Sequence, residues 1–443
     1  MSRLLIAFYG DDFTGSTDAL EQLTLAGIRT ALFIEPPTLM QLKQFPNLQA
    51  IGVAGMTRAM TPSGMEKVLR PALKNLKKLG ARHIHYKVCS TFDSSPKTGS
   101  IGRVIDVASK IFQSPFVPLL VAAPTLGRFT IFGTHYARYG IGSTGAVYRL
   151  DNHPSISKHP VTPMTEADLR LHLAKQTKKK IALFDILKVV LPEKEARAEL
   201  DKLLAQKPGV ILFDALYAEH LPRIGQLIEG FASAKRPLFS VGSSGIEAAL
   251  ATHWTHKKTA PRAARPRTQV LIGSGSCSPI TLGQITWALK NGFAGVSLDA
   301  NALADSKTRT VAIERAASSA VTLLNTGRSV ILFTCKSGAD KRIANILKNR
   351  TAQILGGALG QALRGILKQN PVQRVCIAGG DTSSYAARTL GIQALEMIAP
   401  LTPGAPLCQA YAPGSPLDGH EIVFKGGQVG AENYFEIIKR GKV

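Results

Sequence analysis

The chain has 443 residues, of which 45% are hydrophobic and 19% are charged. This length exceeds one ordinary hydrophobic core, so we expect about two or three domains in a globular enzyme. No apolar run reaches membrane-spanning length, and the chain enters a strand pattern directly, without a charged and apolar leader. The five cysteines form no Cys-x-x-Cys pair, which argues against a disulfide frame or a zinc site. We therefore expect a cytoplasmic protein that does not bind membranes.

The charge is strongly unbalanced, with 54 Lys and Arg against 30 Asp and Glu and a net charge of +24. Basic residues without intervening acids are densest in Lys67–Lys87 and Thr252–Val270. Such an excess suits nucleic acid, but it also suits a pocket for anionic small molecules. Aromatic residues make up only 6% and do not interleave with the basic runs, so base-stacking platforms are not indicated. We expect no nucleic-acid partner, and keep a basic nucleic-acid-binding protein as the alternative from another class.

Short apolar runs alternate with helical patterns along the first 250 residues. We expect strands at Leu4–Tyr9, Thr30–Ile34, Ala50–Ala54, His83–Val88, Pro118–Ala123, Ile181–Ile186, Val210–Phe213 and Pro237–Val241. A second series of expected strands comprises Val270–Ile272, Gly295–Leu298, Val330–Cys335, Val375–Ala378, Ile392–Ile398, Pro406–Tyr411 and Ile422–Phe424. This alternation predicts an α/β fold in which mainly parallel sheets are layered with helices.

A basic, proline-bearing segment, Thr252–Arg267, separates the two series and lacks a sustained apolar period. Such composition is typical of an interdomain linker. We therefore predict an N-terminal domain over residues 1–250, a linker over 251–268 and a C-terminal domain over 269–443. The stretch Gly127–Pro163 has little periodicity and predicts a long functional loop or lid.

The first predicted strand runs straight into acidic and hydroxyl residues. Gly10 ends the apolar run, and Asp11 and Asp12 follow before a helical pattern begins. In an open α/β sheet, ligands bind beyond the carboxyl ends of the strands. A solvated turn or a helix cap is the alternative for either aspartate taken alone.

A second polar cluster follows the strand that ends at Lys87. The loop after it is crowded with hydroxyl and acidic residues, which include Ser90, Asp93 and Ser94. A polyhydroxy carboxylate needs a cation for its carboxylate, together with hydroxyls and carboxylates for its own hydroxyls. Lys87 is one candidate cation, and Arg58, which follows the strand Ala50–Ala54, is another.

Three loops rich in small residues follow strands in the second part of the chain. Their candidate phosphate-binding residues are Ser274, Ser276, Ser278, Gly379, Gly380, Asp381, Thr382, Gly426, Gly427 and Gly430. Glycines let the backbone approach a phosphate, and free amides at a helix start favour its negative charge. No loop matches the Walker P-loop or the dinucleotide fingerprint, which argues against a nicotinamide-dependent dehydrogenase. Together they predict an atypical nucleotide pocket, in which Asp381 could orient a hydroxyl nucleophile or hold Mg²⁺.

These segments together resemble the four-carbon acid sugar kinase family, from the first strand to the last helix. The matching signatures are Asp11–Asp18, Lys87–Gly102, Asn152–Met164, Gly273–Ser278, Gly379–Thr382 and Lys425–Gly430. Within the family, the loop after Lys87 and the segment His159–Pro163 are more similar to 3-oxo-tetronate kinases than to threonate or erythronate kinases. The latter usually carry an asparagine where this chain has Ser100.

The resemblance implies ATP-dependent phosphorylation of a four-carbon sugar acid, with Mg²⁺ as the accompanying ion. It also implies that the N-terminal domain binds the acid and the C-terminal domain binds the nucleotide. We expect the active site in the cleft between them, and allow for a homodimer. The general base is either Asp381 or Asp12, and Asp381 is preferred because it follows a glycine turn that can face phosphate and acceptor together.

Overall fold

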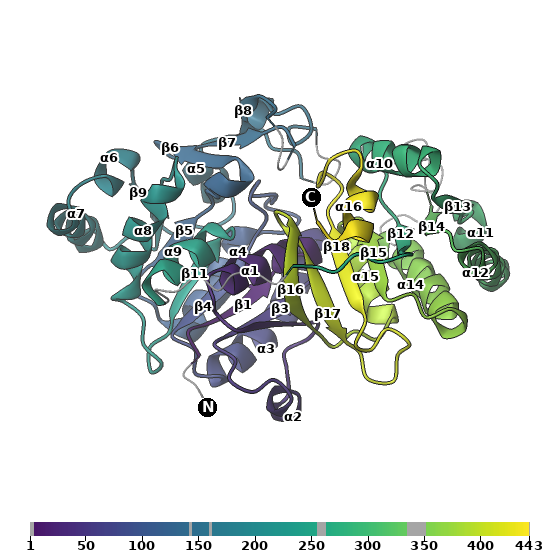
Figure 1. Cartoon of the computed structure of the whole chain (residues 1–443). Coiled ribbons are helices and arrows are strands. Elements are labelled where there is room, and N and C mark those ends of the chain that lie inside the picture. The colour runs from purple at the N-terminus through teal and green to yellow at the C-terminus, as the bar shows by residue number, and fades with distance from the viewer. Residues whose placement is uncertain (1–3, 141–143, 159–161, 255–262, 335–350, 443) are drawn as a thin grey trace. The chain divides into compact units, whose positions relative to one another are not determined.

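A mainly parallel sheet forms the centre of each of two compact units, Met1–Ala260 and Pro261–Val443. The computed structural model describes residues 4–140, 144–158, 162–254, 263–334 and 351–442, apart from the side chain of Asp381. Figure 1 shows the course of the chain from the first strand to the last helix. The α/β prediction is confirmed, because helices and parallel strands alternate in both units.

The sheet of unit 1 has eight parallel strands in the order β2-β3-β1-β4-β11-β5-β10-β9. Its strands are β1 (Ile6–Gly10), β2 (Thr30–Phe33), β3 (Ala50–Ala54), β4 (His83–Lys87), β5 (Val117–Leu120), β9 (Ile181–Phe184), β10 (Val210–Phe213) and β11 (Leu238–Gly242). Each overlaps a strand expected from the sequence. Apart from β4, whose sequence is His-Ile-His-Tyr-Lys, they have the near-continuous apolar character that burial on both faces requires.

Helices cover this sheet in two layers. They are α1 (Phe13–Leu25), α2 (Leu39–Lys43), α3 (Pro62–Lys78), α4 (Ile101–Phe112), α5 (Leu169–Ala174), α6 (Ile186–Val189), α7 (Glu193–Ala205), α8 (Leu221–Glu229) and α9 (Gly245–Trp254). Helix α9 contacts both α1 and α8, whereas α3 and α4 pack together. Helix α9 continues through the first four residues that the sequence assigns to the linker, and residues 255–262 lie outside the described part of the chain.

The two layers determine which side chains of a strand face which helices, because successive residues of a strand point to opposite faces. In β4, Ile84 and Tyr86 join the hydrophobic core built with α3 and α4. His83, His85 and Lys87 therefore face the layer of α1, α8 and α9. A lysine at the end of β4 is thus directed into protein, between two helices.

The stretch Gly127–Pro163, predicted as an irregular loop, instead contains a small antiparallel sheet. Its strands are β6 (Arg128–Ile131), β7 (Thr134–Arg138) and β8 (Val147–Arg149). Two residues with positive φ, Phe132 (50°) and Gly133 (81°), connect β6 to β7 in a tight hairpin. The prediction was wrong because these strands are short and the turn lacks the usual Asn-Gly or Asp-Gly signal.

The sheet of unit 2 has the order β13-β14-β12-β15-β18-β17-β16. Its strands are β12 (Leu271–Ser274), β13 (Ala294–Ser297), β14 (Val330–Phe333), β15 (Arg374–Ala378), β16 (Ala394–Thr402), β17 (Ala405–Tyr411) and β18 (Glu421–Lys425). The first five in spatial order are parallel, and β17 is antiparallel to both its neighbours β18 and β16. All seven overlap expected strands.

The helices of unit 2 also form two groups. They are α10 (Pro279–Lys290), α11 (Ala300–Ala304), α12 (Arg309–Asn325), α14 (Thr351–Gln369), α15 (Asp381–Thr389) and α16 (Tyr434–Arg440). Helix α10 contacts α16, whereas α14 contacts α11, α12 and α15. Helix α15 begins at Asp381, so that Asp381 and Thr382 belong to its first turn.

In each sheet, the connections that follow two neighbouring parallel strands lead to opposite edges of the sheet. The connection from β1 to β2 carries α1 on one face, whereas the connection from β4 to β5 carries α4 on the other. The connections after β12 and β15 likewise lead to opposite edges of the unit 2 sheet. Neighbouring strands whose connections diverge leave a crevice at their carboxyl ends, which is where α/β proteins bind ligands.

A fully buried arginine, Arg374, fastens the ends of unit 2 to its sheet. Its Nε lies 2.8 Å from Glu421 Oε2, and its other nitrogens donate to the carbonyl oxygens of Ile438 (2.5 Å) and Arg265 (2.6 Å). Arg267 completes the pairing of Glu421 at 2.7 Å. One guanidinium thus joins β15, β18, the last helix and the segment that enters the unit.

We predict that Arg374→Met lowers the free energy of unfolding of unit 2 by about 3 kcal/mol, because breaking a buried ion pair leaves its partner incompletely compensated. Urea denaturation of a Trp254→Phe background, in which Trp287 of α10 is the remaining tryptophan, reports on unit 2 alone. Arg440→Met is the control, since its ion pair with Glu436 is exposed. Equal midpoints for the two variants would contradict the anchoring role.

Candidate active site

Asp12 caps the helix that follows β1. Its carboxylate accepts hydrogen bonds from the Gly15 amide (2.8 Å) and the Thr14 hydroxyl (3.0 Å), and lies 2.8 Å from Arg58 Nη2. Burial by itself would raise the pKa of Asp12, but Arg58, the Gly15 amide and Lys87 together hold that pKa below its usual value. Asp12 is therefore an ionised carboxylate that is both the N-cap of α1 and the ionic partner of Arg58.

Asp11 differs sharply from its neighbour. Its amide donates to the Lys87 carbonyl at 2.8 Å, its carbonyl accepts from the Arg58 amide at 3.1 Å, and its side chain is buried. Oδ1 of Asp11 has no hydrogen-bond partner. Burial, and then the charge of Asp12, raise the pKa of Asp11 to about 7. This carboxyl group can therefore gain or lose a proton near neutral pH.

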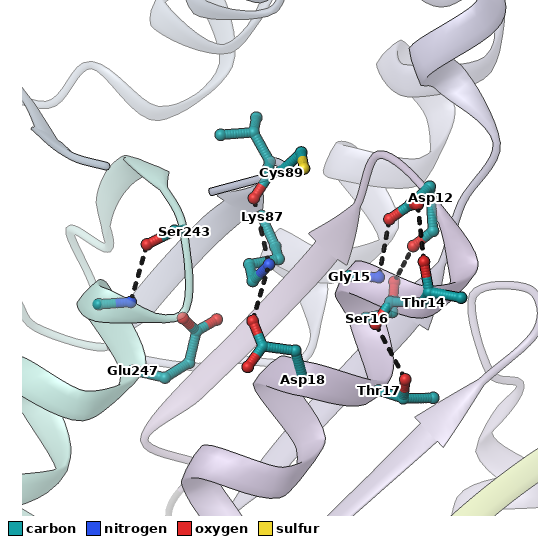
Figure 2. Close-up of polar contacts among 12 residues, drawn as sticks. Asp12, Thr14, Gly15, Ser16, Thr17, Asp18, Lys87, Cys89, Ser243 and Glu247 are labelled. Carbon is teal, nitrogen blue, oxygen red and sulfur yellow. Dashed lines mark hydrogen bonds and ion pairs between the residues drawn. The ribbon is translucent and has the colours of Figure 1, made fainter. Parts of the chain in front are cut away.

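Lys87 is the centre of a buried charged cluster (Figure 2). Its Nζ lies 3.3 Å from Asp18 Oδ2 of α1 and donates to the Val88 carbonyl at 3.1 Å. Burial lowers the pKa of Lys87, but Asp18 and Glu247 more than offset this and leave the pKa raised. Lys87 is thus a charged lysine whose ammonium group is already paired within unit 1.

Glu247 and Asp18, which the sequence reasoning did not select, complete this cluster. Glu247 lies in the first turn of α9, is fully buried, and neither of its carboxyl oxygens has a hydrogen-bond partner. Burial raises the pKa of Glu247 to about 8, against the opposing effect of Lys87. The loop before it, which includes Ser243, repeats the pattern of a strand followed by Gly and Ser residues and then a helix. That repeated pattern is the feature of the sequence from which Glu247 could have been predicted as a site residue.

The loop after β4 is held in place by side chains from other elements. Asp93 accepts a hydrogen bond from Thr91 Oγ1 at 2.9 Å. The Ser94 hydroxyl lies 3.0 Å from His172 Nε2 of α5 and accepts from Gln176 at 2.9 Å. The Ser90 carbonyl lies 2.9 Å from His135 Nε2 of β7. The loop is therefore a fixed wall beside Asp11, with its shape set by unit 1 alone.

Two of the residues that contact this loop from other elements are neutral histidines. Burial lowers the pKa of both His135 and His172 to about 4. Their ring nitrogens are engaged in the contacts above, and His135 also pairs with Thr130 at 2.8 Å. Among the described residues, no group of three or more His, Cys, Asp or Glu side chains could hold a metal ion.

In unit 2 the loops after β12, β15 and β18 touch one another. The hydroxyls of Ser278 and Thr281 donate to the Gly427 carbonyl at 2.7 and 3.2 Å. The Gln284 amide donates to three consecutive carbonyls at 3.0 Å each, those of Val429, Gly430 and Ala431. Helix α10 thus holds the loop after β18 along its first two turns.

Glycine is required where these loops approach most closely. A Cβ at Gly275 would lie 2.8 Å from the Thr382 side chain, and one at Gly379, where φ is 141°, only 2.2 Å from Thr382 Oγ1. A Cβ at Gly427 would lie 3.0 Å from Ser278. The glycines therefore serve close backbone contact, which leaves amide groups accessible along the loops.

Two buried hydroxyls at this edge lack partners. Ser274 Oγ at the end of β12 and Thr382 Oγ1 in the first turn of α15 form no hydrogen bond. Thr382 lies at the N-terminus of α15, and Ser274 precedes the loop that leads to α10; the first amides of a helix and its dipole attract anions. Unsatisfied hydroxyls and free amides at two helix starts fit the phosphates of a nucleotide.

Most of the predicted nucleotide-binding residues fall in these contacting loops: Ser274, Ser276, Ser278, Gly379, Gly380, Thr382, Gly426 and Gly427. Gly430 lies against the Tyr434 ring, where its missing side chain allows packing. The backbone of Asp381 starts α15, and its side chain is outside the described part of the structure. Sequence reasoning missed Thr281, Gln284 and Lys425, whose roles depend on contacts between loops.

Comparison with known proteins divides the chain in the same way. A family model described as a sugar-binding N-terminal domain matches residues 6–250. A second model, described as a nucleotide-binding C-terminal domain, matches residues 271–435. Crystal structures of proteins from Salmonella typhimurium LT2 and Haemophilus influenzae have the same fold. Their TM-scores are 0.76 and 0.70 at 24% and 22% identity, and the matches cover at least 98% of each chain.

Curated relatives extend over nearly the full length. A 3-oxo-isoapionate kinase of Paraburkholderia graminis is 40% identical over 99% of this chain and 95% of its own length. A 3-oxo-tetronate kinase of Pseudomonas savastanoi pv. phaseolicola is 28% identical over 98% of this chain and 96% of its own. With both family models matched in order across the chain, the protein belongs to the four-carbon acid sugar kinase family.

Proposed function

We propose that this protein transfers a phosphoryl group from ATP to a hydroxyl of a small 3-oxo sugar acid. The chain is 40% identical to a 3-oxo-isoapionate kinase and 28% identical to a 3-oxo-tetronate kinase. This difference favours 3-oxo-isoapionate as the substrate over the 3-oxo-tetronate that the sequence motifs suggested. Threonate and erythronate remain the alternatives within the family. The main support is that each unit carries a polar site at the carboxyl ends of the two strands whose connections diverge, and that the two sites differ in chemistry.

The unit 1 site suits an organic acid rich in hydroxyl groups. Arg58, whose side chain is 19% exposed, is the cation best placed to meet the substrate carboxylate, while it also pairs with Asp12. Lys87 contributes only through its charge, because its buried ammonium group is paired with Asp18. Asp11 and the loop with Ser90, Asp93 and Ser94 are the proposed neighbours of the substrate hydroxyls.

The unit 2 loops suit ATP. The hydroxyls of Ser274 and Thr382 and the first amides of helix α15 would hold its phosphates, with Gly426 and Gly427 in the neighbouring loop. Bound ATP supplies the phosphoryl group. Mg²⁺ is expected with it, because kinases hold this ion through phosphates and one or two carboxylates. Asp381 is the acid that directly follows Gly379 and Gly380, and it is the residue we propose for that contact or for the general base.

Phosphoryl transfer requires the acceptor hydroxyl and the terminal phosphate to lie within roughly 3–3.5 Å in a line. The two bound substrates must therefore come together for the reaction. Exclusion of water where they meet would limit ATP hydrolysis.

Three acids compete for the role of general base. Asp12 is a weak candidate because Arg58 and two hydrogen bonds stabilise its ionised form. Asp11 becomes a candidate through its unpartnered oxygen and its pKa of about 7, close to the value that favours a base at neutral pH. Asp381 remains the first choice, as the acid beside the phosphate loops.

No described helix combines the length and the apolar character needed to cross a membrane. The predicted cytoplasmic location and the predicted homodimer both stay predictions. Fractionation of cells and measurement of the mass in solution would test them.

We predict acid-dependent release of ADP that is fastest with 3-oxo-isoapionate, at least about tenfold above 3-oxo-tetronates in kcat/KM, since pockets discriminate one carbon unit by roughly 10- to 200-fold. Threonate, erythronate and pentonates complete the panel. A preference for another acid would revise the substrate. ADP release that no acid stimulates would reject the kinase proposal.

If Asp11 must be ionised, we also predict a fall in kcat/KM for the sugar acid of about tenfold per pH unit below about pH 7. The reason is that a carboxylate base loses activity as it is protonated. Asp11→Asn would then lower kcat/KM at pH 8 by at least about 100-fold and remove this acidic limb. Asp201→Asn, at an exposed ion pair, is the control and should change neither quantity. An acidic limb that persists in Asp11→Asn would point to Asp381 instead.

A further inference from the structure

Lys425, the last residue of β18, is a fully buried lysine without an ionic partner in the described part of the chain. Its Nζ donates one hydrogen bond, to Thr281 Oγ1 at 2.9 Å, and lies 5.8 Å from the centre of the Tyr434 ring. An ammonium group has three N–H donors. Most of the hydrogen-bonding and charge capacity of Lys425 is therefore unused within unit 2.

Such a group is costly, because a buried charge is stable only with an opposite charge or a full set of hydrogen bonds. Burial lowers the pKa of Lys425 to about 8. The titratable groups facing it are Cys376 of β15 and Tyr434 of α16, and burial raises the pKa of the Cys376 thiol to about 12. Thr281 of α10 does not titrate. No neighbouring described group supplies the missing negative charge.

The position of Lys425 indicates where that charge comes from. Its carbonyl accepts a hydrogen bond from the Gly379 amide at 2.9 Å, so the residue joins the loop after β15. Thr281, which accepts from its ammonium, donates in turn to the Gly427 carbonyl. Lys425 thus lies among the three loops that carry the unpartnered hydroxyls of Ser274 and Thr382.

We infer that Lys425 is the buried cation of the nucleotide site, and that it takes up a proton when the polyphosphate of a nucleotide binds. The inference rests on the proposed function. Neutral Lys425, one proton and the nucleotide combine into a complex that holds the ammonium form, stabilised by the phosphate charge. Lys425 acts through Thr281 and the electric field, as a positioning residue that does not contact the reacting atoms.

Isothermal titration of the full-length protein with ADP, without added metal, tests this directly. Titrations at pH 8 in buffers of different ionisation enthalpy give the number of protons exchanged. We expect uptake of about half a proton, because a group with a pKa of about 8 is half protonated in the free protein. Phosphate contributes little there, since its second pKa is about 6. The affinity should also fall about fivefold between pH 8 and pH 9.

Lys425→Met should abolish the proton uptake and make the affinity independent of pH from 7.5 to 9. This variant is expected to fold, because methionine replaces an unpaired buried ammonium with an apolar chain of similar length. Lys290→Met, at the exposed end of α10, is the matched control and should keep the uptake.

The possible failures are distinguishable. ADP binding with the same proton exchange in the wild-type protein and in Lys425→Met would overturn the role of Lys425 and leave the kinase proposal intact. Absence of ADP binding to the wild-type protein would overturn the nucleotide site itself, and the inference with it.

Discussion

Both candidate sites depend on one constraint: two neighbouring parallel strands whose connections lead to opposite edges of the sheet. Between β1 and β4, and again between β12 and β15, the connections leave toward opposite edges. Helices then cannot cover the carboxyl ends of these neighbouring strands, and the loops after them share a crevice. The loops of unit 1 carry Asp11, Asp12 and Asp93, whereas those of unit 2 are rich in glycine and serine. We therefore propose that similar backbone arrangements serve an organic acid in one unit and phosphates in the other.

Buried cations are compensated in opposite ways at the two candidate sites. In unit 1, Lys87 has Asp18 and Glu247 as acidic neighbours, and Asp12 has Arg58, so the cations are compensated before any ligand arrives. In unit 2, Lys425 has no acidic neighbour in the described structure. The proposed acid site thus has fixed internal pairing, whereas the buried charge of the proposed nucleotide site is incompletely compensated.

The sequence predicted the main sheets well, because strands buried on both faces form apolar runs that stand out between helical patterns. It also located the strand-end loops with Asp11, Asp12 and Gly379. It missed β6–β8, whose Phe132-Gly133 turn carries no usual signal. It missed Glu247 and Lys425, because their significance comes from what surrounds them after folding. It proposed Lys87 as a cation for the substrate carboxylate, and could not show that alternation along β4 directs this side chain toward Asp18.

The separation of the two substrates between the two units can be measured directly by hydrogen exchange. ADP alone should slow amide exchange at residues 274–278 and 379–382, and the sugar acid alone should slow it at residues 11–15 and 88–94. Protection of both groups of residues by ADP alone, or protection by the acid confined to unit 2, would contradict this account.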